Sequence, residues 1–313
     1  MGTAEGEVFV GIDVSKARLD VHRLPDGAAR TFGYDAEGLA GLLGWLRTAP
    51  PCLVVLEATG GLQLRAAAEI GAAGLPVAVV NPRQVRDFAR AAGRLAKTDR
   101  LDAEAIARFA AAIRPEPRPL PDAECQALIE LLARRRQLIE MRTAEKLRLA
   151  TLHPALRPGL QAHIAWLARA IDALDTDIDA QVRASAIWRH EAALLTSVPG
   201  VGKGTANTLI ALLPELGRIP TASLTALVGL APFNHDSGTL RGQRHIRGGR
   251  SRVRAALYMA TLTAIRCNPQ LRSFHHRLRT AGKPPKLAIT ACMHKMLRIL
   301  AAIIRSNSPW RAA

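Results

Sequence analysis

Four carboxylates stand where a folded chain could bind divalent metal ions. Asp13 follows an apolar run and so lies at the end of an expected buried strand, and Glu57 ends a second such run. Asp99 and Asp102 open an expected helix and, being three residues apart, share one of its faces. Carboxylates suit hard ions such as Mg²⁺, and two ions can clamp the attacking and leaving oxygens of phosphoryl transfer. The four acids therefore predict a Mg²⁺ or Mn²⁺ site that acts on a phosphodiester.

Each acid taken alone has a simpler interpretation. Asp99, next to Thr98, could cap a helix, and Glu57 could pair with an arginine. Four acids clustered without metal would repel one another, so the set favours bound ions.

The elements that must position these acids alternate as in a layered α/β domain. Two strands are expected within residues 8–24, further strands at 28–34, 52–57 and 77–80, and helices at 39–46, 62–70, 84–92 and 98–113. This order of three strands, helix, strand, helix, strand, helix is that of the ribonuclease-H-like fold.

A proline-rich stretch ends this domain, with prolines at 115, 117, 119 and 121 forming a stiff linker. Two long helices with coiled-coil-like apolar spacing follow, either as a hairpin or oligomerisation arm or as part of a plain bundle. The fold class is thus α/β plus all-α. We divide it into a catalytic domain at 1–115, a helical arm at 116–190 and a basic, mainly helical domain at 191–313.

Charge is distributed unevenly over these segments. The whole chain carries +17; residues 1–113 contain 13 basic and 13 acidic residues, 114–190 contain 12 and 10, and 191–313 contain 18 and 3. A local excess of that size favours a polyanion such as nucleic acid, and most of these cations are arginines, which suit phosphate. The alternative is a solubilising surface.

Two stretches of the basic domain could bind phosphate. Residues 195–206 resemble a helix-hairpin-helix, in which Gly200, Gly202 and Lys203 would present backbone N–H groups to a phosphate. A nucleotide-binding P-loop is disfavoured because its spacing is absent. Around a glycine pair, six arginines recur as further candidates: Arg241, Arg244, Arg247, Arg250, Arg252 and Arg254.

A nucleophile is harder to choose from residue chemistry. Ser237 stands in an Asp-Ser-Gly turn, but Ser197 and Ser251 are equally visible. Nearby arginines could stabilise a pentacovalent phosphate without selecting among these serines.

The remaining bulk features indicate a cytoplasmic protein. The cysteines show no zinc or disulfide spacing, and we expect no membrane segment and no secretory signal.

Several motifs together resemble one known family. They are Gly-Ile-Asp-Val-Ser-Lys at 11–16, Glu-Ala-Thr-Gly at 57–60, Lys-Thr-Asp-Arg-Leu-Asp-Ala at 97–103, Val-Pro-Gly-Val-Gly at 198–202, Gly-Leu-Ala-Pro at 229–232 and Asp-Ser-Gly at 236–238. In this order they are similar to the DEDD transposases of the insertion-sequence one-hundred-and-ten family of bacterial mobile elements.

The resemblance implies a RuvC-like N-terminal domain, a coiled-coil arm and a C-terminal transposase domain. It implies that Asp13, Glu57, Asp99 and Asp102 bind the metal and that Ser237 is the nucleophile, forming a phosphoserine link during strand exchange. It also implies donor and target DNA as substrates, a structured bridge RNA as guide, dimers that pair into a tetramer, and action near the bacterial nucleoid.

Two other functions fit the residues. A junction resolvase would use the same acids with water as nucleophile, and an architectural nucleic-acid-binding protein would have lost the chemistry. Because a long arm separates Ser237 from the acids, we also expect a composite site shared between protomers.

Overall fold

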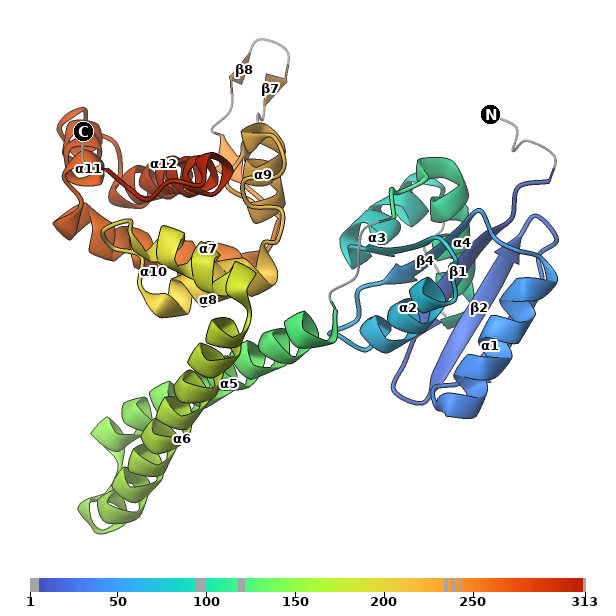
Figure 1. Ribbon diagram of the computed structural model, residues 1–313, viewed down its shortest axis with the longest axis horizontal. Helices are drawn as coiled ribbons and strands as arrows, with labels where there is room; N and C mark the ends of the chain where they lie inside the picture. Colours follow the sequence, from blue (N-terminus) through green and yellow to red (C-terminus); the bar gives the residue numbers. More distant parts are fainter. Residues whose placement is uncertain are drawn as a thin grey trace. The chain divides into compact units, whose positions relative to one another are not determined.

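The computed structural model describes residues 6–93, 99–117, 122–233, 236–237, 240–241 and 244–311, with the backbone alone at 99–101, 236–237 and 240–241. The chain forms two compact units, residues 1–121 and 122–313 (Figure 1). The helical arm belongs to the second unit. The division of that unit into an arm and a basic domain stays a prediction.

The N-terminal unit is built on a five-stranded sheet of order β3-β2-β1-β4-β5. Strands β1, β2 and β3 are antiparallel, whereas β4 and β5 run parallel to β1. The strands are β1 (Phe9–Val14), β2 (Arg18–Leu24), β3 (Ala29–Gly33), β4 (Leu53–Glu57) and β5 (Val77–Val80). This mixed sheet is compatible with the expected ribonuclease-H-like fold.

Helices cover both faces of the sheet (Figure 1). They are α1 (Ala36–Thr48), α2 (Gln63–Ala72), α3 (Pro82–Ala91) and α4 (Asp99–Ile113). Alternate residues of β1 point to opposite faces, so Val10 and Ile12 enter one core with α1 and α2. Phe9 enters the other core with α3 and α4.

The second unit begins with an antiparallel helical hairpin of α5 (Ala123–Thr151) and α6 (Arg157–Ala184), joined through a short 3-10 turn at Pro154–Leu156. Arg135 on α5 pairs with Asp175 on α6 at 2.5 Å. The Gln181 side chain donates to the carbonyl of Glu124, nearer the start of α5. A residue near the end of α6 therefore contacts a residue at the start of α5, as two antiparallel helices require.

In the part of this unit that the structure describes, six further helices pack around one large core: α7 (Ala186–Thr196), α8 (Lys203–Leu212), α9 (Thr221–Val228), α10 (Ser251–Cys267), α11 (Pro269–Thr280) and α12 (Pro285–Ser306). Among the described residues, α12 alone is long and apolar enough to span a membrane. Its apolar residues, including Met293, Met296 and Leu300, are buried in this core, which accounts for its composition.

Candidate active site

Asp13 and Glu57 are neighbours at the carboxyl ends of two parallel strands. The register pairs Ile12 of β1 with Leu56 of β4, so the next residues of both strands, Asp13 and Glu57, lie side by side. They also share a face, because Phe9 on β1 and Val55 on β4 enter the core beneath α4 with the same alternation. Both are partly buried. Two acids far apart in the chain are thus adjacent on the α4 side of the sheet.

Helix α4 runs antiparallel to β1. Arg114, just after the helix, pairs with Glu7 before the strand, and its guanidinium lies 5.3 Å from the centre of the Phe9 ring. The start of α4 therefore adjoins the end of β1 that carries Asp13. Asp102 is partly buried, and the backbone of Asp99 opens the helix.

Gly11 lets this helix approach the sheet. A Cβ on Gly11 would lie 2.2 Å from the backbone nitrogen of Ala107 and 2.4 Å from the carbonyl oxygen of Ala103. No side chain fits there, so the backbones of α4 and β1 touch directly. Asp102 lies one residue before Ala103, and Asp13 lies two residues after Gly11.

The loop after Glu57 is fixed by a buried glutamine. Gln63 is 6% exposed, and its side-chain oxygen accepts from the backbone N–H groups of Thr59 and Gly61 at 2.9 and 3.1 Å. Gly60 and Gly61 have positive φ, which the turn between β4 and α2 requires. The sequence analysis did not identify Gln63.

Within the part of the chain whose side chains are described, no three Asp, Glu, His or Cys residues form a group that could hold a metal. Asp13, Glu57 and Asp102 are all described and do not form such a group, and the side chain of Asp99 is outside the description. The oxygen-donor chemistry of Asp13, Glu57 and Asp102 fits a hard divalent ion.

Ser237 lies in a short hairpin of the second unit. Strand β7 (Asp236–Ser237) pairs with β8 (Leu240–Arg241), and Ser237 is opposite Leu240. The strands of a second ladder, β6 (Pro232–Phe233) and β9 (His245–Ile246), flank this hairpin in sequence. Figure 1 shows β7 and β8 projecting beyond α9.

The two ends of this segment are locked where they cross. Gly229 and Gly249 both have positive φ, and a Cβ on Gly249 would lie 2.2 Å from the nitrogen of Gly229. The Arg254 guanidinium donates to the carbonyls of Val228 and Gly248 at 3.0 and 2.6 Å, which ties the two ends together.

The six predicted arginines therefore have different environments. Arg250 forms two hydrogen bonds of 2.6 Å with the Glu215 carboxylate and a third, of 2.8 Å, with the carbonyl of Leu212. Arg250 and Arg254 hold the fold together, and Glu215 is a partner that the sequence analysis missed. Arg244, Arg247 and Arg252 are exposed, and the side chain of Arg241 is outside the description.

The predicted helix-hairpin-helix corresponds to α7, a turn and α8. Gly200 has φ +100°, and a Cβ there would lie 2.5 Å from the Cα of Ala264 on α10. Lys203 is the first residue of α8 after its N-cap, Gly202, and pairs with Asp179 of α6 at 2.8 Å. This hydrogen bond holds the pKa of Asp179 below its usual range. The turn is thus packed against α6 and α10.

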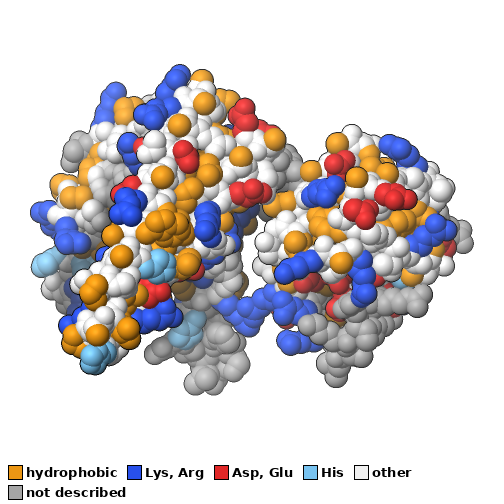
Figure 2. Space-filling view, turned by 90° about the horizontal axis from the view of Figure 1, so that it is seen from below, with side chains coloured by type: hydrophobic (Ala, Val, Ile, Leu, Met, Phe, Trp, Pro, Cys, Tyr) orange, Lys and Arg blue, Asp and Glu red, His pale blue; other side chains and the backbone are white. Residues whose placement is uncertain are grey.

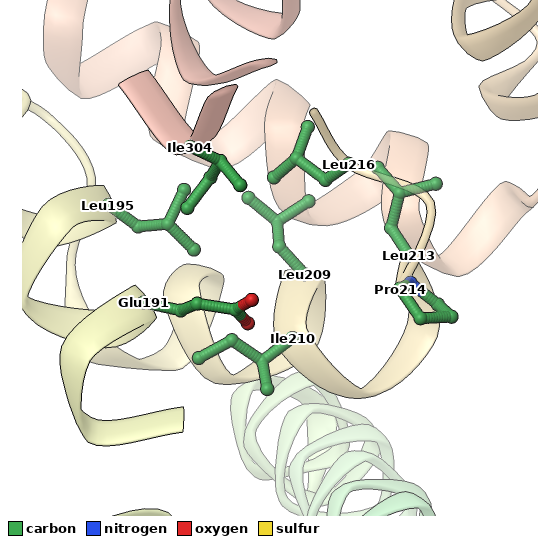
Figure 3. Close-up of a pocket in the computed structure, with 8 residues that line it drawn as sticks. All are labelled: Glu191, Leu195, Leu209, Ile210, Leu213, Pro214, Leu216 and Ile304. Atoms are coloured by element: carbon green, nitrogen blue, oxygen red, sulfur yellow. The ribbon is translucent and has the colours of Figure 1, made fainter. Parts of the chain in front are cut away.

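A small crevice lies between α7, the end of α8 with the segment after it, and α12 (Figure 3). Its volume is about 10 Å³, and Glu191 is the one ionisable residue among seven apolar neighbours. It has room for about one water molecule and none for a nucleotide.

Comparison with known proteins defines the class. A family described as "Transposase", of the DEDD and IS110 type, matches residues 10–156. A second family, described as "Transposase IS116/IS110/IS902 family", matches residues 192–276. The first match covers nearly all of the N-terminal unit and continues through α5, and the second lies within the second unit. Together they cover most of the chain, and the protein is a DNA transposase or recombinase.

Curated relatives agree with this class. The chain is 29% identical over 319 aligned positions to the "Pilin gene-inverting protein" of Moraxella bovis, covering 97% of this chain and 98% of that protein. It is 31% identical to an "Insertion element IS900 uncharacterized 42 kDa protein" of Mycobacterium paratuberculosis, over 54% of this chain and 45% of that one. The chain belongs to the IS110 family of transposases, and its substrates are DNA.

Proposed function

We propose that this transposase cuts and rejoins DNA strands through a serine–phosphate intermediate, using Asp13, Glu57, Asp99 and Asp102 as a divalent-metal site and Ser237 as nucleophile. The observation that carries the metal site is the β1–β4 register, in which Asp13 and Glu57 are neighbours on the face covered by α4. Bound Mg²⁺ or Mn²⁺ would neutralise charge on the attacking and leaving oxygens.

The chain's own residues have the following roles. Asp13 and Glu57 provide carboxylate oxygens from the rigid sheet, and Asp99 and Asp102 add theirs from the first turn of α4. The Oγ of Ser237 attacks the phosphorus, one P–O bond of the DNA breaks, and the serine proton balances the charge of the leaving oxygen. The new phosphoserine ester conserves the bond energy needed for rejoining.

The proposal extends to assembly and guidance. The carboxylates and Ser237 belong to different units, so we infer that dimers and tetramers combine the acids of one protomer with the serine of another. A structured bridge RNA would pair with donor and target DNA, leaving the protein to bind backbone and shape. DNA substrates favour action in the bacterial cytoplasm.

The test is a covalent adduct. Purified protein, with Mg²⁺, RNA transcribed from the DNA flanking its gene and labelled DNA, should yield a denaturant-stable protein–DNA product that Ser237→Ala abolishes. Asp13→Asn should abolish cleavage while DNA binding survives. Metal-dependent cutting without any adduct would instead indicate a junction resolvase with water as nucleophile, and DNA binding without cutting would indicate an architectural protein.

Mixing the two inactive variants tests the composite site. Asp13→Asn and Ser237→Ala proteins should together recover part of the cleavage, because some mixed assemblies pair intact acids with an intact serine. Inactivity of oligomers shown to be mixed would mean that each site is built within one chain.

A further inference from the structure

The end of the chain is basic without any acidic residue. From Ser237 to Ala313 the sequence contains 16 Lys and Arg residues and no Asp or Glu. This region includes α10, α11 and α12, so acids within it cannot neutralise its cations. Partners must come from earlier parts of the chain or from another molecule.

Some of these cations are used inside the fold. Arg250 pairs with Glu215, and Arg254 binds two backbone carbonyls. Arg305 on α12 donates to the carbonyls of Gly217 and Ile219, both at 3.3 Å. These arginines stabilise the second unit and are not a free surface.

A second group lies on the surface around α11. We call this group the α11 surface; all its members are exposed: Arg266, Arg272, Arg277, Arg279, Lys283 and Lys286. Among the described residues, no acidic side chain forms an ion pair with any of them. Exposed cations of the arm differ, since Arg136 pairs with Glu140 at 3.4 Å and Arg148 with Glu145 at 3.1 Å.

Helix α11 presents these cations outward. Leu271 is fully buried and Phe274 packs against the same core. Arg272 and Arg279 follow Leu271 by one and eight residues. At 3.6 residues per turn, both therefore lie on the same side of the helix, rotated by about 100° from the buried Leu271. Figure 2 shows Lys and Arg side chains along the margin of the second unit on the side where Figure 1 draws α11.

The surface lacks the features of base recognition. The one phenylalanine of α11, Phe274, is covered by cations, with Arg277 5.2 Å and Lys295 4.8 Å from the ring centre, and the helix has no Tyr or Trp. Proteins that bind single strands stack bases on aromatic rings, whereas a surface of charge alone binds phosphates. Helix α11, at 12 residues, spans roughly 18 Å and can follow several phosphates of a duplex.

We propose that the α11 surface binds the sugar–phosphate backbone of duplex DNA without reading its sequence. This deepens the transposase function, since it gives the DNA substrate a binding surface outside the predicted arginines of residues 241–254. DNA phosphates would neutralise these exposed cations while releasing counterions from the DNA.

The test removes charge at positions whose side chains form no hydrogen bond or ion pair with the described residues, although Arg277 lies over the Phe274 ring. In the full chain, Arg277→Gln, Lys283→Gln and Lys286→Gln are combined; Arg272 and Arg279 are kept because they donate to backbone carbonyls. Binding to a short duplex of scrambled sequence is measured between about 50 and 200 mM salt. The salt slope should fall in magnitude by about 2–3, and affinity near 0.1 M salt by up to roughly 10²-fold.

A matched control separates this surface from general charge. Arg136→Gln, Lys146→Gln and Arg148→Gln remove the same charge from the arm and should leave the duplex slope unchanged. Equal losses in both triples would overturn the proposal, as would an unchanged slope in the α11 triple.

Duplex RNA of the same sequence provides a second arm. A loss confined to RNA would show an RNA surface and refute the assignment to DNA. The unfolding midpoints of both triple variants must match that of the parent chain, so that a loss of binding reflects charge and not unfolding. This test is independent of the proposed serine chemistry. If the chain formed no serine adduct but the α11 surface bound DNA, the triple variant would still show the smaller salt slope.

Discussion

Replacing Gly11 with alanine tests whether α4 holds the acids together. The added Cβ would meet the Ala107 nitrogen at 2.2 Å and the Ala103 oxygen at 2.4 Å. Real Cβ atoms stay more than 3 Å from such atoms, so the helix must move away from β1 by about 1 Å. Neither contact can give way by a rotamer change, because both atoms are backbone.

This displacement has two measurable costs. Overpacking of this kind destabilises a core by roughly 1–3 kcal/mol. A misplacement of about 1 Å at a catalytic site costs about 10²-fold in rate. We therefore expect a lower urea midpoint, slower cleavage and a higher Mg²⁺ requirement, because the first turn of α4 moves away from Asp13 and Glu57.

The matched control is Gly44→Ala on α1. A Cβ there meets nothing within 4 Å, and alanine favours a helix over glycine by about 1 kcal/mol. That variant should gain stability and cleave normally. If Gly11→Ala keeps the parent stability, cleavage rate and Mg²⁺ requirement, the packing of α4 on β1 and its role in the site are both refuted.

The contacts of the second unit give two more predictions. Glu215→Gln should lower the stability of this unit by about 1–3 kcal/mol and reduce serine-adduct formation, because it weakens a bidentate charged hydrogen bond to Arg250. Calorimetry and adduct yield measure this, and Arg252→Gln, at an exposed neighbour, should leave the stability unchanged. Lys203→Met should cost about 0.2–1 kcal/mol at neutral pH. Its partner Asp179 has a lowered pKa, so the stabilisation exists above the usual value of 3.8 and disappears as pH falls through the folded pKa. The free energies of unfolding of the parent chain and the Lys203→Met variant, measured with urea from pH 7 to pH 3, should approach each other as the pH falls. A difference that stays constant over this range would mean that the charge pair contributes nothing.

Local pattern was enough to predict the position of the acids in the sheet. The apolar runs before Asp13 and Glu57 have the length and composition of buried strands; β4 ends at Glu57 as predicted, and β1 ends at Val14, one residue beyond Asp13. Because side chains alternate between the two faces along a strand, the position of each acid in its strand then gives the face of the sheet on which it lies. The relation of α4 to β1 could not be predicted in this way, since it depends on one missing Cβ, at Gly11, and a spacing pattern does not show which glycine a helix will cover.

Arginine roles were the least predictable feature. Arg250 and Arg252 are two residues apart in the same glycine-rich stretch, yet one is bonded to Glu215 and the other is exposed. The partner lies 35 residues earlier, so composition alone cannot distinguish an internal guanidinium from a phosphate ligand. Residues 266–286 contain cations and no acid, a pattern that is visible in the sequence. It points to a phosphate-binding surface only after the arginines that are bonded inside the fold have been set aside.

Both parts of the proposed chemistry depend on backbone contacts that only glycine permits. Gly11 allows α4 to touch β1, and the crossing of Gly229 with Gly249 closes the base of the segment that carries Ser237. Contacts between backbones leave little room for adjustment, because no side chain can rotate to absorb a shift. These two contacts hold α4 against β1 and close the base of the Ser237 segment, each within its own unit. We therefore expect assembly on DNA, rather than a rearrangement inside either unit, to be the step that controls cutting.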